Sequence, residues 1–240
     1  DDAKQLALGL SGHRLNQLIP LKIDRWLREI TGQDAVLNPY TLLLSRIQKP
    51  VLIDSSKYPN WVSQRLNARE FRQGHLDAYV IHVVRDGRAV LNSYLRAYPN
   101  LTVETVSQRW LNNLEASEKV YGSVAADRRM QVRYEALATN PTKTVQGVCD
   151  FLGIPFEPGM LEYWQHDHNY IAGSRSAKAL IARYREQPVS EATQEIHGSY
   201  YSEMDLTIKL DQRWKDELET AKLKQFQEIV GTRNQPFEWN

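Results

Sequence analysis

The sequence predicts an α/β domain in three layers, a mostly parallel sheet flanked by helices. Two apolar runs, residues 51–54 and 78–84, are predicted to be buried strands, and residues 130–133 a third, short strand. The segments between them have helical periodicity and are long enough for right-handed crossovers between parallel strands. We therefore expect a single domain over residues 1–240.

The helices are predicted from apolar residues spaced three or four apart and from capping residues. Asn140 as N-cap with Pro141 at the first helical position marks one start, and Asp211 and Gly231 mark the two ends of the last helix. The other predicted helices cover most of 6–30, then 41–48, 60–71, 87–98 and 102–121.

Composition excludes several classes of protein. Of the 240 residues, 42% are hydrophobic and 25% charged, as in ordinary globular domains. Thirty Lys and Arg against 29 Asp and Glu leave a net charge of +1, which does not favour a nucleic-acid or membrane partner. No apolar run is long enough to span a bilayer. The single cysteine, Cys149, cannot form an internal disulfide, and residues 166–168 (His-Asp-His) are too few to bind a metal, so we expect none.

Ligands of parallel α/β sheets bind at the carboxyl ends of the strands, which carry residues 54–57 and 85–86 here. Arg85 leaves a strand just before a helix, and Ser93 lies two turns into that helix. A guanidinium, the N–H groups of a helix N-terminus and a hydroxyl favour a phosphate or sulfate site. The alternative is that Arg85 pairs with a surface carboxylate while Asp86 caps the helix.

The segment 83–96, VVRDGRAVLNSYLR, resembles the 3′-phosphate-binding segment of sulfotransferases that use 3′-phosphoadenosine 5′-phosphosulfate (PAPS). Its RDGRA form is similar to tyrosylprotein, bacterial and carbohydrate sulfotransferases. Three further parts of the chain resemble the family in the family's order: 51–57 (VLIDSSK), then 132–137 with 140–141 and 151–155, and then 168–175 with 211–214. Together the four segments span most of the chain.

The resemblance implies a P-loop-like fold and transfer of a sulfuryl group from PAPS to a hydroxyl of a saccharide, lipid or peptide, without a metal. It implies that Arg85 and Ser93 bind the 3′-phosphate. It also implies that Gly173-Ser174-Arg175 closes over the nucleotide, with Arg175 a second phosphate ligand. Tyr134 matches an aromatic near the adenine; the alternative for this tyrosine is simple packing.

Two residues at the end of the first predicted strand are candidates for catalysis. Sulfuryl transfer resembles phosphoryl transfer, which depends on positioning and on stabilising charge at the leaving group, completed by a general base. Lys57 is the candidate for charge stabilisation and Asp54 for the base. The alternative for Asp54 is that it caps the following helix, together with Ser55 and Ser56.

One family motif is missing from the sequence. The loop that holds the 5′-phosphosulfate should precede residues 54–57, and nothing between residues 1 and 57 matches it. Because the chain does not begin with Met, we favour an N-terminally incomplete sulfotransferase; the alternative is an inactive nucleotide-binding module of the same fold. A kinase relative would need a Walker lysine and magnesium carboxylates, which are not seen. The absence of cysteine pairs favours the cytoplasm over the Golgi lumen.

Overall fold

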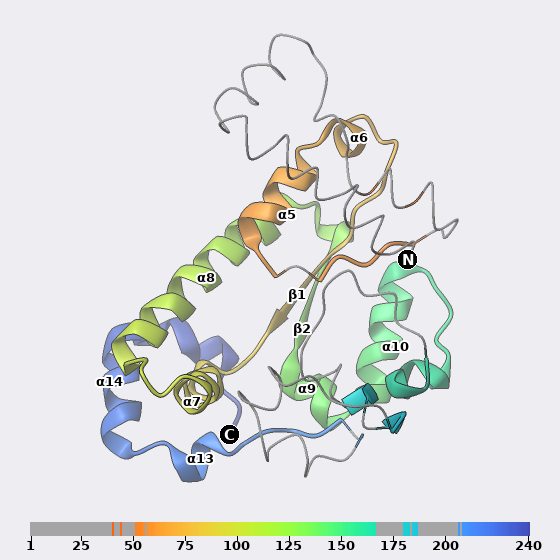
Figure 1. Ribbon diagram of the computed structural model, residues 1–240. Helices are drawn as coiled ribbons and strands as arrows, with labels where there is room; N and C mark the ends of the chain where they lie inside the picture. Colours follow the sequence, from red (N-terminus) through yellow and green to blue (C-terminus); the bar gives the residue numbers. More distant parts are fainter. Residues whose placement is uncertain are drawn as a thin grey trace, which may run out of the picture. The chain divides into compact units, whose positions relative to one another are not determined.

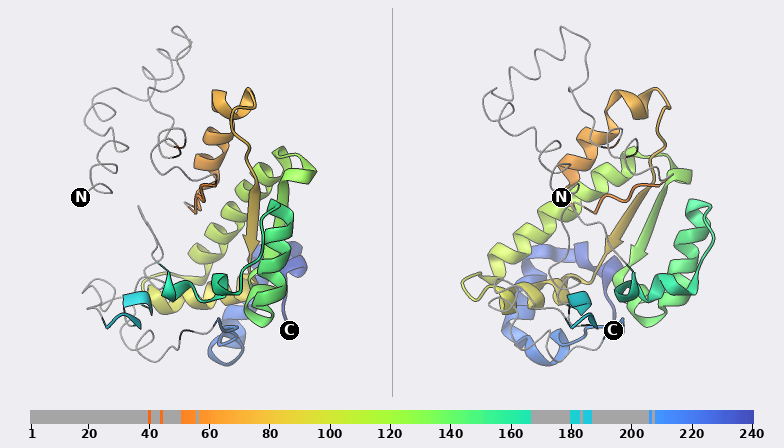
Figure 2. Two further views of the ribbon diagram at one scale, coloured as in Figure 1. Left: turned by 90° about the vertical axis from the view of Figure 1, so that its right-hand side faces the viewer. Right: turned by 45° about the vertical axis from the view of Figure 1, so that its right-hand side comes forward.

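The computed structural model describes residues 40, 44, 51–55, 57–166, 180–182, 184–186, 206 and 208–240 (Figures 1 and 2). The chain divides into two compact units: a first unit of residues 1–77 with 168–173, and a second unit of residues 78–167 with 174–240. The helix predicted at 6–30, and most of that at 41–48, lie outside the described residues. The single domain stays a prediction.

In the first unit, helices α5 (Pro59–Leu66) and α6 (Arg69–Arg72) replace the one helix predicted over 60–71. Pro59 occupies the first helical position of α5, where its missing N–H costs nothing. The helix ends at Asn67, whose backbone and side-chain N–H groups both donate to the Ser63 carbonyl. This local capping explains why the predicted helix is broken in two.

The strand predicted at 51–54 is wrong, since these residues form no regular structure. Val51 is 50% and Ile53 84% exposed, so the run is not buried on two faces. A strand needs a neighbour to pair with its N–H and C=O groups, and no described residue pairs with this run. Three apolar residues, Val51 to Ile53, are also too few for periodicity to identify a strand.

The second unit holds a parallel sheet of two strands, the only sheet among the described residues. In it β1 (Val80–Val84) pairs with β2 (Arg129–Arg133), with Val80 opposite Arg129 and Val84 opposite Arg133. Helices α7 (Gly87–Ala97) and α8 (Val103–Ser123) and the short 3₁₀ helix η1 (Ala126–Arg128) connect them. The α/β prediction is confirmed for these two strands.

Most of the remaining elements of the second unit pack either on the sheet or on the helices beside it. After β2 come α9 (Tyr134–Thr139), α10 (Pro141–Leu152), η2 (Pro158–Leu161), η3 (Tyr163–Gln165), α13 (Trp214–Glu217), α14 (Thr220–Val230) and η4 (Gly231–Phe237). Helix α8 packs against β1, and α9 and α10 pack against β2 (Figure 1). The single helix predicted at the C-terminus is divided into α13 and α14. The division falls at Leu218, where the backbone is extended and the side chain enters the core.

Local sequence signals place the helix ends of the second unit. The side chain of Thr102 accepts a hydrogen bond from the Thr105 amide at the start of α8, and that of Asn140 accepts one from the Lys143 amide at the start of α10. Gly153 ends α10 with φ 66°, in the left-handed region that glycine adopts without strain. The predicted start at Asn140-Pro141 is confirmed.

The main core joins helices that are distant in sequence. Its buried residues come from α7, α8, α13 and α14 and from the link between the last two: Ala89, Leu91, Val103, Val106, Trp214, Leu218, Phe226 and Val230. The C-terminal segment then returns to the strands, where the Arg133 guanidinium donates to the carbonyls of Phe237 and Glu238, each at 2.8 Å. The carboxyl ends of the strands are therefore held by the chain's last residues.

Replacing Gly87 with alanine is expected to destabilise the protein. An added Cβ would lie 2.6 Å from Phe226 Cζ and 2.8 Å from Asn234 Oδ1. Such overpacking costs about 1–3 kcal/mol, more than the better helix propensity of alanine returns. Urea unfolding followed by circular dichroism measures the change.

The matched control is Gly147→Ala in α10, where the nearest atom to an added Cβ is Met130 Cε at 3.9 Å. This variant is expected to gain about 0.5–1 kcal/mol from helix propensity. Equal stability of Gly87→Ala and the wild type would contradict the close packing at Gly87.

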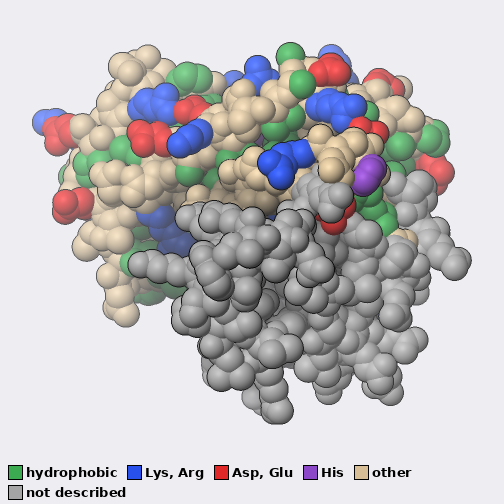
Figure 3. Space-filling view, turned by 90° about the horizontal axis from the view of Figure 1, so that it is seen from above, with side chains coloured by type: hydrophobic (Ala, Val, Ile, Leu, Met, Phe, Trp, Pro, Cys, Tyr) green, Lys and Arg blue, Asp and Glu red, His purple; other side chains and the backbone are tan. Residues whose placement is uncertain are grey.

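The surface of the described part mixes both signs of charge. On the face seen in Figure 3, Lys and Arg side chains lie among Asp and Glu side chains rather than gathering by sign. No helix among the described residues has both the length and the apolar character needed to cross a membrane.

Candidate functional site

Asp86 lies between β1 and α7, and its buried carboxylate accepts several hydrogen bonds. It is 1% exposed, and it accepts hydrogen bonds from the Arg88 amide (2.9 Å) and guanidinium (2.7 Å at the shortest), from Asn234 Nδ2 (3.2 Å) and from the Trp239 amide (3.0 Å). Burial alone would raise the pKa of Asp86, but these hydrogen bonds outweigh it and lower the pKa. Asp86 therefore caps α7, as one sequence interpretation proposed.

The first N–H groups of α7 are already bonded within the protein. The Asp86 amide donates to Glu135 Oε1 at 2.8 Å, the Gly87 amide to Asn234 Oδ1 at 2.7 Å, and the Arg88 amide to Asp86 Oδ1. Our expectation that these N–H groups bind an anion is wrong. Two carboxylates, from Asp86 and Glu135, already oppose the positive end of the helix dipole.

Arg85, one residue earlier, extends from the carboxyl end of β1. Its guanidinium lies over the Tyr134 ring, 4.3 Å from the ring centroid, and Nη2 contacts Asp211 Oδ2 at 3.2 Å and the Asp211 carbonyl at 3.4 Å. Its Nε is buried and has no hydrogen-bond partner among the described residues. The predicted alternative, a carboxylate partner, is thus present, and the buried Nε stays without a partner among the described residues.

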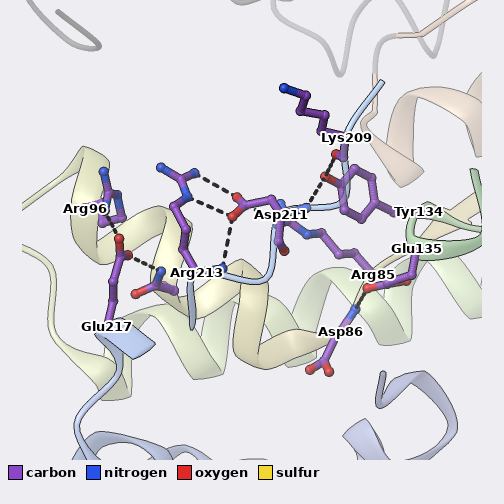
Figure 4. Close-up of polar contacts among 10 residues, drawn as sticks. Arg85, Asp86, Arg96, Tyr134, Glu135, Lys209, Asp211, Arg213 and Glu217 are labelled. Carbon is purple, nitrogen blue, oxygen red and sulfur yellow. Dashed lines mark hydrogen bonds and ion pairs between the residues drawn. The ribbon is translucent and has the colours of Figure 1, made fainter. Parts of the chain in front are cut away.

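Asp211 lies between two guanidinium groups (Figure 4). Arg213 donates to its carboxylate twice, from Nε and Nη2, both at 2.8 Å. The Arg213 hydrogen bonds lower the pKa of Asp211 to about 2 against the opposing effect of burial, and the charge of Arg85 contributes least. Asp211 is therefore ionised at neutral pH.

Tyr134 connects Arg85 to the segment before Asp211. Its hydroxyl donates to the Lys209 carbonyl at 3.2 Å and accepts from the Asp211 amide at 3.3 Å (Figure 4). The ring forms a platform under the Arg85 guanidinium, a cation–π contact that favours a fixed orientation of the planar group. Its predicted place near an adenine stays a prediction.

Ser93 is exposed on α7, two turns after Arg85, as the sequence predicted. One turn further on, the Arg96 guanidinium pairs with Glu217, which also accepts a hydrogen bond from Asn92 Nδ2 at 2.7 Å. The Ser93 hydroxyl has no hydrogen-bond partner in the part of the chain that the structure describes. It is therefore free to donate to a ligand.

The two catalytic candidates lie in the first unit. Asp54 Oδ2 accepts hydrogen bonds from the Tyr40 hydroxyl and, at 2.7 Å, from Trp61 Nε1. Burial and the Asp54 carboxylate raise the pKa of Tyr40. The alternative of Asp54 as a helix cap is wrong, because the N-cap residue of α5 is Tyr58.

Lys57 has φ 65°, in the left-handed region that is costly for a residue with a side chain. Strain of this kind is concentrated at functional sites. The left-handed backbone is thus consistent with a functional role for Lys57, but it does not identify that role.

Three further points of the sequence analysis concern the loop 173–175, His82 and metal binding. Gly173, Ser174 and Arg175 lie outside the described residues. His82 packs beside Tyr121, with ring centroids 5.7 Å apart, and burial lowers its pKa, which suits a neutral structural histidine. No group of three or more potential metal ligands occurs among the described residues.

The model of the sulfotransferase family matches residues 68–158, the segment that contains β1, α7 and Tyr134. The resemblance to sulfotransferases is confirmed. Over 93 residues, 36% of this chain, the sequence is 27% identical to a protein-tyrosine sulfotransferase of Drosophila melanogaster. The match spans 19% of the length of that relative.

Two solved structures are similar to this chain. One is the sulfotransferase domain from the curacin biosynthetic pathway, 21% identical, with a TM-score of 0.49 over 84% of this chain and 68% of that one. The other is the sulfotransferase domain from the Synechococcus PCC 7002 olefin synthase, also 21% identical, with a TM-score of 0.49 over 80% and 62%. Because both TM-scores are below 0.5, the fold assignment rests on the strands and helices of this chain and not on these two structures.

Sequence reasoning missed two features of the site. The pairing of Asp211 with Arg85 joins residues 126 positions apart, and the hydrogen bond from the Asp86 amide to Glu135 joins residues 49 apart. The sequence predicts Asp211 as the cap of the last helix, which is wrong, because Arg213 is the N-cap residue of α13 and Glu219 that of α14. The place of Asp211 two residues before Arg213, in a segment similar to the family, was the signal available in the sequence.

Proposed function

We propose that this chain is a sulfotransferase that moves a sulfuryl group from PAPS to a hydroxyl acceptor. Arg85 carries the proposal, because it lies at the carboxyl end of β1, within the matched segment, and keeps a buried Nε without a partner among the described residues. Buried donors in native proteins are usually bonded, so an unused one favours a ligand that completes it. A guanidinium is suited to phosphate oxygens.

The chain's side chains fit the 3′-phosphate of such a nucleotide. Arg85 would supply two or more N–H donors from a plane fixed by the Tyr134 ring, and Ser93 an exposed hydroxyl. The loop 173–175 is proposed from the resemblance alone, as a cover over the nucleotide with Arg175 as a further phosphate ligand. PAPS itself supplies the sulfuryl group; the protein's part is to hold and orient it.

Lys57 and Asp54 are proposed as catalytic residues. An ammonium such as that of Lys57 stabilises charge on the leaving oxygen, and a carboxylate accepts the proton of the acceptor hydroxyl. Asp54 Oδ2 already accepts two hydrogen bonds, so this oxygen is less open to the proton of an acceptor hydroxyl. Lys57 is accordingly the stronger candidate of the two.

For the acceptor we propose a hydroxyl of a saccharide, a lipid or a peptide, as the resemblance to sulfotransferases implies. For the compartment, we propose the cytoplasm, with the Golgi lumen as the alternative. The reason is that one buried cysteine, Cys149, suits a reducing environment.

Calorimetric titration with 3′-phosphoadenosine 5′-phosphate, 5′-AMP and ATP tests the proposal. We expect the 3′-phosphate to tighten binding about 10- to 150-fold over 5′-AMP, the equivalent of hydrogen bonds to a charged group. ATP should bind no better than 5′-AMP. Equal affinity for the nucleotides with and without the 3′-phosphate would contradict the proposal.

Incubation with PAPS and hydroxyl acceptors separates an enzyme from a binding module. An enzyme releases 3′-phosphoadenosine 5′-phosphate in step with sulfation of the acceptor. Tight nucleotide binding without that release would favour the inactive module.

A further inference from the structure

The contact between Arg85 and Asp211 is long for an ion pair. Charge-assisted N–H···O bonds between guanidinium and carboxylate groups are about 2.7–2.9 Å long. Arg85 Nη2 lies 3.2 Å from Asp211 Oδ2, whereas both bonds from Arg213 to the same carboxylate are 2.8 Å. Asp211 is therefore held firmly by Arg213 and loosely by Arg85.

The residues that carry Asp211 contact the Arg85 side through the Tyr134 hydroxyl. Residues 209–211, which we call the latch segment, have no regular secondary structure and contact the Tyr134 hydroxyl at 3.2 and 3.3 Å. On the other side, Arg213 precedes Trp214, which is 8% exposed in the core. The anchored side and the weakly bonded side are seen together in Figure 4.

We propose that Asp211 is an internal competitor for the anion site at Arg85. In the free protein the latch segment holds the Asp211 carboxylate against Arg85, and a phosphate group binds by replacing it there, while Asp211 stays paired with Arg213. This inference rests on the proposed function in one respect, that Arg85 binds the 3′-phosphate.

The exchange is favourable on charge and on donor count. A phosphate carries more negative charge than a carboxylate and more oxygens that accept hydrogen bonds. It can therefore approach Arg85 more closely than Asp211 does, and it can also engage the buried Nε, which Asp211 leaves unbonded. The Tyr134 ring holds the guanidinium plane during the exchange.

Asp211→Asn tests the proposal, because it removes the charge and keeps the shape. We expect the affinity for 3′-phosphoadenosine 5′-phosphate, measured by calorimetry, to rise about three- to fivefold, the equivalent of a partly exposed ion pair. Asp211→Ser is the second variant, should the asparagine variant fold poorly. Weaker or unchanged binding in the folded variant would overturn the proposal and assign Asp211 to orienting Arg85.

Glu217→Gln is the matched control. It removes one negative charge from the same neighbourhood, where Glu217 pairs with Arg96 and not with Arg85. It should leave the affinity nearly unchanged. A gain equal to that of Asp211→Asn would overturn the proposal in favour of a general charge effect.

A second measurement needs no nucleotide. Phenylglyoxal modifies accessible guanidinium groups, and peptide mass spectrometry reports its rate at Arg85. The rate of modification at Arg85 should rise in Asp211→Asn and stay at the wild-type value in Glu217→Gln. If the rate does not rise in Asp211→Asn, the proposal that Asp211 covers Arg85 is overturned. A rise in a protein that shows no preference for the 3′-phosphate would support the latch and contradict the proposed function.

Discussion

Replacing Asp86 with alanine is expected to lower the free energy of unfolding by about 3–5 kcal/mol, the cost of removing one partner of a buried ion pair. Asp86 is 1% exposed and accepts bonds from Arg88, Asn234 and the Trp239 amide. Alanine leaves these donors without an acceptor and removes the cap of α7. Urea unfolding followed by circular dichroism measures the loss.

The matched control is Asp150→Ala, an exposed carboxylate in the last turn of α10. Its unfolding free energy should stay within about 0.5 kcal/mol of the wild type. Because the folded pKa of Asp86 is below its usual 3.8, the advantage of the wild type over Asp86→Ala should be complete above pH 3.8. It should shrink as the pH falls through the folded value. An Asp86→Ala variant as stable as the control would refute this role.

Replacing Arg85 with alanine is expected to weaken binding of 3′-phosphoadenosine 5′-phosphate by about 1.5–3 kcal/mol, or roughly 10- to 150-fold. The side chain is 23% exposed and its ion pair with Asp211 is long, so the fold should lose little. Arg85→Lys should recover only part of the affinity, because an ammonium lacks the planar fork. Calorimetric titration measures both variants.

Arg109→Ala serves as the control for Arg85→Ala. Arg109 is an exposed arginine of α8 whose guanidinium lies over the Tyr94 ring. Its loss removes the same charge from the protein without touching Arg85, and the affinity should stay within about twofold. A loss of affinity as large as that of Arg85→Ala would show that net charge, and not Arg85 itself, attracts the nucleotide.

The parts of the fold that the sequence predicted are those with local causes. The apolar run 78–84 and the helical spacing after Gly87 depend on neighbours within a few residues, and β1 and α7 formed where expected. The capping side chains of Thr102 and Asn140 act over three residues. Arg85 and Ser93 could be singled out because the strand–helix junction itself is local.

The parts that could not be predicted depend on distant partners. Asn234 bonds the Gly87 amide from 147 positions away, and this contact, with Glu135, removes the helix N-terminus from use as an anion site. The run 51–54 has strand-like residues, but a strand also requires a pairing partner, which four residues do not encode. Sequence patterns describe preferences along the chain and not which distant side chain satisfies them.

Arg85 is proposed to recognise the 3′-phosphate of the nucleotide. The most direct test is the ratio of affinities for 3′-phosphoadenosine 5′-phosphate and 5′-AMP, measured by calorimetry in the wild type and in Arg85→Ala. We predict that the wild type prefers the 3′-phosphorylated nucleotide about 10- to 150-fold. In Arg85→Ala most of that preference should be lost, leaving only what Ser93 contributes, while 5′-AMP binds as before. An unchanged preference, or an equal loss of affinity for both nucleotides, would contradict the claim.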